Sequence, residues 1–555
     1  MPDLKLLTAE PSAAERAAID TVLGAPPEAN GHRSARDDRE SRHLLLPALR
    51  AAQRRVGWVS EGALGYASRR LSVPPAEAYG VATFYALLAL EERPADVTHV
   101  CTDLACALKG ATVGPGEHAS PCLGLCERAP ARYRTVAGPA PFEEQLPAQS
   151  PPLPQQVLNR DSGLRLLRRI ADGVDPTSLD AYVAAGGFAA LARARELGPD
   201  AVIAEVTESR LLGRGGAAFP TGVKWRAVRD QPDPTRYVVC NADESEPGTF
   251  KDRVLMESDP FALVESLAIA GLATGAQKGF VYIRAEYPLA HARVQNAIDA
   301  SAPYLDGFEL ELRIGAGAYV CGEETALFQS IEGKRGEPRN KPPFPVEVGL
   351  FGKPTAVNNV ETLFNVLEVL RLGAAAYAEA GTEGSAGTRL FCVSGCVERP
   401  GLYELPFGAT LRELLELAGT GSVKAVLLGG AAGAFVAPEQ LDLRLTHEDT
   451  RAAGATLGSG VVIVYDDDAD LVGALVRIAE FFRDESCGQC VPCRVGTVRQ
   501  EEALRRLAAG TPHADELQTL AELAQVMRDA SICGLGQTAA NAVASAIVNL
   551  GVFAA

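Results

Sequence analysis

Eight cysteines in two close groups constrain this chain more than any other feature of its sequence. The first group consists of Cys101, Cys106, Cys122 and Cys126, and the second of Cys487, Cys490, Cys493 and Cys533. Because a reducing cytoplasm keeps thiols from pairing as disulfides, grouped cysteines there indicate metal binding or redox chemistry. The remaining four, Cys240, Cys321, Cys392 and Cys396, are dispersed or lie in apolar runs, and we interpret them as small buried hydrophobic residues.

The second group has the spacing C-x2-C-x2-C, followed much later by Cys533. This spacing lets one loop supply three thiolates to a cubane cluster, while the fourth arrives from another helix end. The arrangement suits a [4Fe-4S] cluster. Zinc is the alternative, although its sites more often use two C-x2-C pairs.

The first group has the spacing C-x4-C followed by C-x3-C, which is too open for a thioredoxin-type redox pair. Two irons that each take a pair of thiolates would fit it, as in a [2Fe-2S] cluster. Zinc is again the main alternative.

The 555 residues exceed what one hydrophobic core serves, so we expect a multidomain α/β and α+β protein. A helical unit at 1–95 should precede a cysteine-bearing unit at 96–150, with a proline-rich linker and domain boundary over Gly138–Gln156. Strands and helices alternate over 160–375, which predicts an α/β domain with a largely parallel sheet. We expect a small α+β domain at 385–465 and a helical bundle at 466–555.

The composition excludes several classes of partner. A formal net charge of -17 opposes nucleic-acid binding, which needs a basic surface. No apolar run is long enough to cross a bilayer, and Met1–Glu10 has no signal-peptide core. We therefore expect a cytoplasmic protein without direct membrane insertion, which contacts membranes only through partners.

Three glycine-rich loops lie within the expected α/β domain: Leu212–Trp225, Asn241–Arg253 and Gly315–Leu327. In the first, the glycines would let backbone amides approach a phosphate, with positive charge from Arg214 and Lys224. It is not a Walker loop, because no G-K-[ST] follows. The other two loops combine glycine with carboxylates. Each loop alone is equally well explained as a tight or solvated turn, but three in one domain indicate a ligand site.

The motifs LGRGGAAFPTGVKW, CNADESEPGTFKDR, GAGAYVCGEETAL and ESCGQCVPCRVGT closely resemble the flavin-bearing, NADH-oxidising subunit of respiratory complex I. The same subunit recurs in NAD-reducing hydrogenases and NAD-dependent formate dehydrogenases. The stretch VPPAEAYGVATFYALL, with CTDLAC and CLGLC, resembles the separate 24-kDa-type thioredoxin-like subunit, here fused to the first. The resemblance implies a thioredoxin-like [2Fe-2S] domain, a Rossmann-like FMN/NADH domain, a small ubiquitin-like domain and a helical [4Fe-4S] bundle.

The resemblance also implies the residues that bind each cofactor. Both cysteine groups would be cluster ligands. FMN would be held by Gly213, Arg214, Gly215, Lys224, Asn241, Asp243, Glu244, Ser245, Tyr319, Gly322, Glu323, Glu324, Asn358 and Asn359. NAD(H) would lie between Phe219 and Phe344, with Lys341 beside the latter, and Glu246 would repel a 2′-phosphate, which favours NAD over NADP. No catalytic acid or base is implied, because the hydride passes directly from NADH to FMN.

Two departures from the family pattern stand out. The usual AGFPTG becomes Ala217-Ala218-Phe219, which would crowd the loop if position 218 needs a positive φ. The thioredoxin-like part is short, both between Cys106 and Cys122 and after Cys126, so some of its elements are expected to be missing or remodelled.

The expected function is that of a diaphorase that exchanges electrons between NAD(H) and a partner enzyme. The tail MRDASICGLGQTAANAV and the fusion favour the β subunit of a molybdenum or tungsten formate dehydrogenase, whose partner is an iron–sulfur and molybdopterin subunit. A hydrogenase or complex I assembly is the alternative. A zinc-bound structural or assembly protein is the non-enzymatic alternative.

Overall fold

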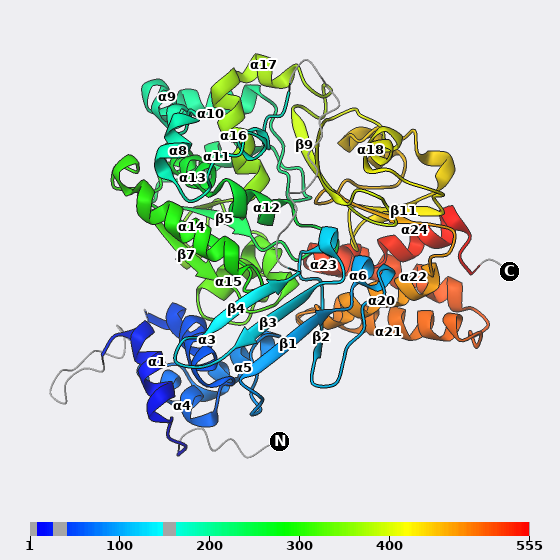
Figure 1. The fold of residues 1–555 in the computed structure, drawn as a ribbon, viewed down its shortest axis with the longest axis horizontal. Coiled ribbons are helices and arrows are strands. Elements are labelled where there is room, and N and C mark those ends of the chain that lie inside the picture. The colour runs from blue at the N-terminus through cyan, green and yellow to red at the C-terminus, as the bar shows by residue number, and fades with distance from the viewer. Residues whose placement is uncertain (1–7, 26–40, 148–162, 554–555) are drawn as a thin grey trace.

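The computed structural model describes residues 8–25, 41–147 and 163–553. In Figure 1 the chain passes from a helical unit (blue) to a small sheet (cyan) at the centre of the molecule. It continues through an α/β domain (green) and an α+β domain (yellow), and it ends in a helical bundle (orange to red) beside the central sheet.

The N-terminal unit is helical, as predicted, and packs against the α/β domain. Its helices are α1 (Ala13–Leu23), α3 (Leu45–Val56), α4 (Glu61–Arg70) and α5 (Pro75–Phe84), with the 3-10 turn η2 (Ser41–Leu44). Helix α5 starts at Pro75, where the missing N–H of proline costs nothing. Leu45 and Leu49 share one hydrophobic core with Phe280 and Leu327 of the α/β domain.

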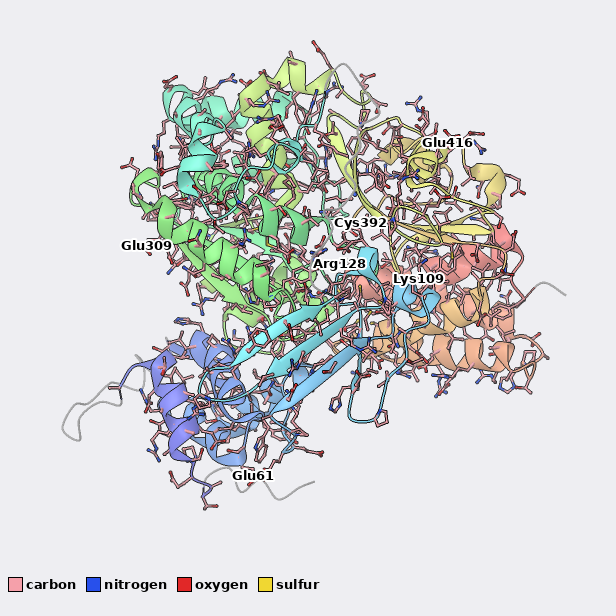
Figure 2. The ribbon with its side chains drawn as sticks, in the orientation of Figure 1. Glu61, Lys109, Arg128, Glu309, Cys392 and Glu416 are labelled. Atoms are coloured by element: carbon pink, nitrogen blue, oxygen red, sulfur yellow. The ribbon has the colours of Figure 1, made fainter. Side chains whose placement is uncertain are left out.

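The central sheet has the order β2-β1-β3-β4. It contains β1 (Asp96–Cys101), β2 (His118–Ser120), β3 (Arg132–Val136) and β4 (Phe142–Leu146), with α6 (Leu104–Leu108) and η3 (Cys126–Arg128) beside it. Strands β1 and β2 are parallel, and the other pairs are antiparallel. Figure 2 shows Lys109 and Arg128 where α6 and η3 meet the strand that bears Cys392.

The predicted linker Gly138–Gln156 was wrong over its first half, because β4 lies within it and pairs with β3 along five residue positions. The prolines misled the prediction: Pro141 and Pro147 flank β4 instead of interrupting it. An edge strand tolerates such flanking prolines, since its outer side needs no ladder partner. The second half of the predicted linker, from residue 148, lies outside the described residues.

The α/β domain contains a fully parallel sheet, as predicted, in the order β7-β6-β5-β8. Its strands are β5 (Tyr237–Ala242), β6 (Lys278–Ile283), β7 (Glu309–Ile314) and β8 (Thr355–Asn359). The helices are α7 (Arg168–Ala171), α8 (Leu179–Ala184), α9 (Ala189–Leu197), α10 (Pro199–Glu208), α11 (Thr221–Arg229), α12 (Lys251–Ser258), α13 (Pro260–Thr274), α14 (Pro288–Ser301), α15 (Glu324–Ile331), α16 (Val360–Leu372) and α17 (Ala374–Ala378), with short turns η4 (Ala302–Tyr304), η5 (Tyr319–Gly322) and η6 (Leu350–Gly352).

The strand order puts the switch point of the sheet between β5 and β8, and we call the region at the carboxyl ends of these two strands the crevice. The chain runs outward from β5 to β6 and β7, then returns to add β8 on the opposite side of β5. The chain segments that follow β5 and β8 therefore lead away from each other at the carboxyl ends of these two strands. Ligands of open parallel sheets bind at such a switch point.

The last two domains follow the predicted order. The α+β domain contains β9 (Thr388–Gly395), β10 (Gly401–Pro406), α18 (Leu411–Ala418), β11 (Ala425–Leu428), β12 (Ala434–Val436), η7 (Pro438–Gln440), α19 (His447–Ala452) and β13 (Val461–Tyr465), in the sheet order β10-β9-β13-β11-β12. The bundle contains α20 (Leu471–Asp484), α21 (Val491–Ala508), α22 (Glu516–Ala530), α23 (Gly534–Thr538) and α24 (Asn541–Leu550). Among the described residues no helix has the length and apolar character needed to span a bilayer.

Buried arginines fasten the first cysteine loop to the α/β domain. Arg253 is fully buried, forms ion pairs with Glu127 and Glu257, and donates from Nε to the Gly124 carbonyl (2.8 Å). Arg284 donates to the Cys122 carbonyl (2.7 Å). A buried charge is tolerated only when it is paired and hydrogen-bonded, so these contacts fix how the two domains dock.

Arg253→Met should therefore destabilise the protein by about 3 kcal/mol, because Glu257 would be left buried without its cation and Glu127 would keep only Arg128. Urea unfolding measures this loss. Arg499→Met is the matched control, since the Arg499–Glu502 pair is solvent-exposed and should matter far less. Equal shifts for the two variants would contradict the assigned role of Arg253.

Candidate functional site

The cysteines of the first group come together at the carboxyl end of β1, in the central sheet. Cys101 ends β1, Cys106 lies in α6, and Cys126 begins η3. The Sγ atoms of Cys122 and Cys126 are 3.4 Å apart. Contacts with the Cys106 and Cys122 thiols, together with burial, raise the pKa of Cys101. All four thiols are therefore together, as the spacing predicted.

Backbone amides point at these sulfurs. The N–H groups of Gly124 and Ala131 lie 3.4 Å from the Sγ atoms of Cys122 and Cys106. Such N–H···S contacts stabilise negative charge on sulfur and tune a cluster. Thiols this deeply buried ionise only opposite a strong cation, so the donor set suits iron–sulfur binding.

The second cysteine group gathers at helix starts. Cys490 caps α21, Cys493 lies in its first turn, and Cys533 caps α23, so the fourth thiol does come from another helix end. Burial, and then the neighbouring thiols of Cys490, Cys533 and Cys487, raises the pKa of Cys493 to about 12. The amino end of α21 favours the thiolate form. Within the described residues no three His, Cys, Asp or Glu side chains converge closely enough to hold one metal ion.

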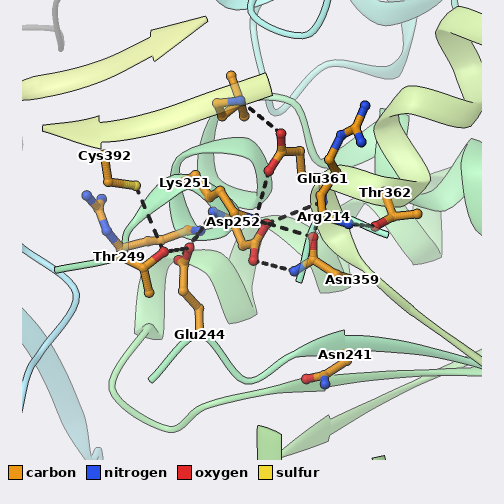
Figure 3. A network of polar contacts seen from close by, with 12 residues as sticks. Arg214, Asn241, Glu244, Thr249, Lys251, Asp252, Asn359, Glu361, Thr362 and Cys392 are labelled. Carbon is orange, nitrogen blue, oxygen red and sulfur yellow. Dashed lines mark hydrogen bonds and ion pairs between the residues drawn. The ribbon is translucent and has the colours of Figure 1, made fainter. Parts of the chain in front are cut away.

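The crevice between β5 and β8 is lined by amide side chains. Asn241 donates to the Gly322 carbonyl (2.7 Å) and so ties the second loop to the third. Asn359 donates to Asp252 (2.6 Å), while Asn358 accepts from the Trp225 indole (2.9 Å). Figure 3 shows Asn359 within a network with Lys251 and Asp252, and Asn241 apart from it.

The first loop lies directly over this crevice and needs its glycines. A Cβ on Gly215 would lie 3.2 Å from the Asn359 Cβ, and Gly216 has a φ of +115°. Any side chain would therefore hold the loop away from the sheet. The exposed backbone can instead approach a ligand phosphate closely.

Two polar groups in the crevice have unused hydrogen-bonding capacity. Lys224 donates to the Val357 carbonyl (2.8 Å), and its other two N–H groups have no acceptor in the described part of the chain. Burial lowers its pKa. Asp243 Oδ2 is buried without a partner, and burial raises the pKa of this carboxyl to about 8. Donors and acceptors in this state fit a polar ligand such as FMN.

Two aromatic rings flank the mouth of the site. Phe219 is 50% exposed and Phe344 is 53% exposed, which is unusual for rings of this size. Lys341 bridges Glu323 (2.9 Å) and Glu324 (2.8 Å) and so joins the third loop to the segment that bears Phe344. Exposed rings suit stacking on a planar nucleotide base.

Glu244 faces the protein interior. It accepts from the backbone N–H groups of Asp252 (2.8 Å) and Arg253 (2.9 Å) at the start of α12. Burial raises its pKa to about 7. Ser245 donates to Asp243 (3.0 Å). The hydrogen bonds of Glu244 and Ser245 therefore stabilise the conformation of the second loop.

Glu246 joins the α/β domain to the α+β domain. Its carboxylate accepts from the Tyr319 hydroxyl and from the Ala432 N–H (2.8 Å). Burial raises its pKa to about 7. The Tyr319 N–H in turn donates to Glu485 (2.7 Å), close to the second cysteine group.

Sequence reasoning missed Lys251, Asp252 and Glu361. Lys251 forms ion pairs with Asp252 (2.7 Å) and Glu361 (3.1 Å), and this trio holds Asn359 in place (Figure 3). The first two stand inside the motif CNADESEPGTFKDR, whose charged end could have signalled them. Of the four dispersed cysteines, Cys396 is only half-buried, and the other three are buried as predicted.

Ala218 does adopt the strained conformation that its departure from the family pattern suggested, with φ +52°. Ala218→Gly should therefore stabilise the protein by about 0.5–1 kcal/mol, because relief of left-handed strain exceeds the entropy gained by the unfolded chain. Thermal denaturation measures the change. The neighbouring Ala217→Gly relieves no such strain and should be destabilising. Loss of stability in both variants would refute the strain argument.

Family models match four parts of the chain. They are the Nuo51 FMN-binding domain at residues 206–368, the NADH-ubiquinone oxidoreductase-F iron-sulfur binding region at 473–550, the thioredoxin-like [2Fe-2S] ferredoxin at 32–113 and the SLBB domain at 390–428. The thioredoxin-like match begins after α1, includes the helices from α3 to α6, and stops before Cys122.

Known proteins resemble the chain over most of their own length. NADP-reducing hydrogenase subunit HndC of Solidesulfovibrio fructosivorans is 43% identical over 69% of this chain and 81% of that protein. An NADH-quinone oxidoreductase subunit of Aquifex aeolicus is 43% identical over 68% of this chain and 91% of that protein. A crystal structure of an NAD+-reducing [NiFe]-hydrogenase matches with a TM-score of 0.80 and 34% identity, covering 94% of both chains. The chain therefore belongs to the complex I 51-kDa-type family of NADH-oxidising flavoproteins, which use FMN, [2Fe-2S] and [4Fe-4S] centres.

Proposed function

We propose that the crevice between β5 and β8 binds FMN and NAD(H), and that electrons leave it through the two cysteine groups to a partner subunit. One observation supports this most strongly: the loops of the crevice contact the first cysteine group and the helix that leads to the second. The thiols of Cys101 and Cys126 lower the pKa of Cys122, and the Gly248 N–H of the second loop adds to this effect. Tyr319 of the third loop packs 5.0 Å from the Phe481 ring on α20, the helix that leads to Cys487.

The proposed flavin ligands line the crevice. The backbone of Gly213, Gly215 and Gly322 would approach the flavin, and Lys224, Asn241, Asp243, Asn358 and Asn359 would meet its polar atoms. Arg214, Glu244 and Ser245 would position the loops from behind. Tyr319, Glu323 and Glu324 would close the side that faces the nucleotide.

The chain's own task is to orient the reactants, because bound FMN supplies hydride acceptance and the clusters supply one-electron transfer. Phe219 and Phe344 would stack on the nucleotide and fix its distance from the flavin. Lys341 would keep the carboxylates of Glu323 and Glu324 neutralised at the mouth. No side chain needs to move a proton for a hydride to pass.

We propose the catalytic subunit of a molybdenum or tungsten formate dehydrogenase as the partner. The segment around Cys533 resembles the formate dehydrogenase form of the family. A nickel–iron hydrogenase is the second candidate, favoured by the 94% mutual coverage with the hydrogenase chain. A cytoplasmic location belongs to the same proposal, since the thiols must stay reduced to take up iron.

Purification of the tagged chain from its own cells, followed by metal analysis, tests the partner. We expect molybdenum or tungsten to co-purify with the chain, and formate to reduce NAD+. Nickel in their place would overturn the formate dehydrogenase assignment and favour the second candidate. A protein that contains zinc and neither flavin nor iron would overturn the diaphorase proposal itself.

Glu246 should discriminate against NADP(H) in a pH-dependent way. Its pKa is about 7, so above that pH the carboxylate is charged and repels a 2′-phosphate, and the repulsion fades as the pH falls below 7. The ratio of kcat/KM for NADH and NADPH, measured from pH 6 to 8, should fall toward acid. Glu246→Gln should raise NADPH use by about tenfold at pH 8 and flatten the profile. An unchanged preference would remove Glu246 from the nucleotide site.

A further inference from the structure

We propose that Arg389, in the α+β domain, is a positioning residue for the flavin. Its buried, unpaired positive charge acts together with that of Arg214 behind the first glycine-rich loop. There the two charges attract the phosphate end of FMN. This inference rests on flavin binding in the crevice, and it adds a residue outside the FMN-binding domain.

Neither arginine has a carboxylate in direct contact within the part of the chain that the structure describes. Arg389 and Arg214 are fully buried, and neither forms an ion pair within the described part of the chain. Arg389 donates to the Gly458 carbonyl, while its Nε and Nη1 atoms have no partner. Arg214 donates only to carbonyls and to the Tyr377 hydroxyl, and its Nε atom also has no partner.

The guanidinium groups of Arg214 and Arg389 both lie near the ring of Phe407. Their Cζ atoms lie 4.6 Å (Arg214) and 5.9 Å (Arg389) from the Phe407 ring centroid. Gly458, which accepts from Arg389, approaches the loop closely: a Cβ built on Gly216 would lie 3.7 Å from the Gly458 carbonyl. Figure 3 shows the Arg214 side chain pointing away from the Lys251–Asp252–Asn359 network.

Nearby groups cancel only part of the two charges. The carboxylates of Glu361 and Asp252 share the one ammonium group of Lys251, so this trio carries a single net negative charge. His447, whose ring lies 5.3 Å from Phe407, stays neutral, because burial and the charges of Arg389 and Arg214 lower its pKa to about 3. The two arginines and this trio together therefore retain about one uncompensated positive charge behind the loop.

Burying a charge without a partner is unfavourable, so an anion beside this loop would stabilise the protein. The phosphate of FMN is the anion that the glycine-rich loop is shaped to receive. Because both guanidinium groups are sealed from solvent, they act through the loop backbone, where low polarity keeps the attraction strong. Arg389 therefore touches neither flavin nor nucleotide.

The test compares Arg389→Met with the wild type, each as the full chain with and without FMN. Arg389→Met should weaken FMN binding about tenfold, measured by fluorescence titration of the flavin-free protein. The flavin-free variant should melt at the same temperature as the wild type or higher, because an unpaired buried charge is gone. Arg389→Lys keeps the charge and should keep most of the FMN affinity.

Arg169→Met is the control, since Arg169 is buried but paired with Asp259 (2.7 Å). It should lower the melting temperature and leave FMN affinity unchanged, the opposite pattern. The proposal is overturned if Arg389→Met binds FMN as tightly as the wild type, or if its flavin-free form melts earlier, as Arg169→Met should. A wild-type chain that bound no FMN would instead refute flavin binding in the crevice.

Discussion

The buried polar contacts of the loop that follows β5 hold this molecule together. Glu244 accepts hydrogen bonds from the first backbone N–H groups of α12. Glu246 accepts hydrogen bonds from Tyr319 and from the α+β domain. Arg253, at the end of the loop, donates a hydrogen bond to the first cysteine loop. Gly248 packs so tightly on β13 that a Cβ would lie 2.4 Å from Val461. Buried polar groups tolerate little displacement once their partners are fixed, so one short segment sets how the domains meet.

In the proposed function, this arrangement sets the route of the electrons. The crevice at the sheet switch point lies between two sets of thiols that belong to different domains. Because the loop after β5 also contacts Cys122, a shift of the first cysteine group would disturb the proposed flavin site. A fused chain keeps this geometry without relying on association between separate subunits.

Charge is distributed unevenly within the site. Carboxyl groups with raised pKa values line the second loop, while unpaired arginines lie behind the first. Buried cations without an ion-pair partner favour an anionic ligand beside them, whereas burial holds part of the carboxyl groups in the protonated form.

The order of the domains, the two cysteine groups and the three glycine-rich loops could all be predicted from the amino-acid sequence, because spacing and backbone freedom are local properties. It also pointed to the strained position of Ala218. It misjudged β4, since a proline-flanked edge strand looks like a linker until its partner strand is seen. The packing of the folded chain was needed to show that Glu244 faces inward, that Lys251 of α12 pairs with Glu361 of α16, and that Arg389 lies behind a loop of another domain. Contacts between residues this far apart in the sequence depend on how the domains pack, and local sequence patterns do not predict that packing.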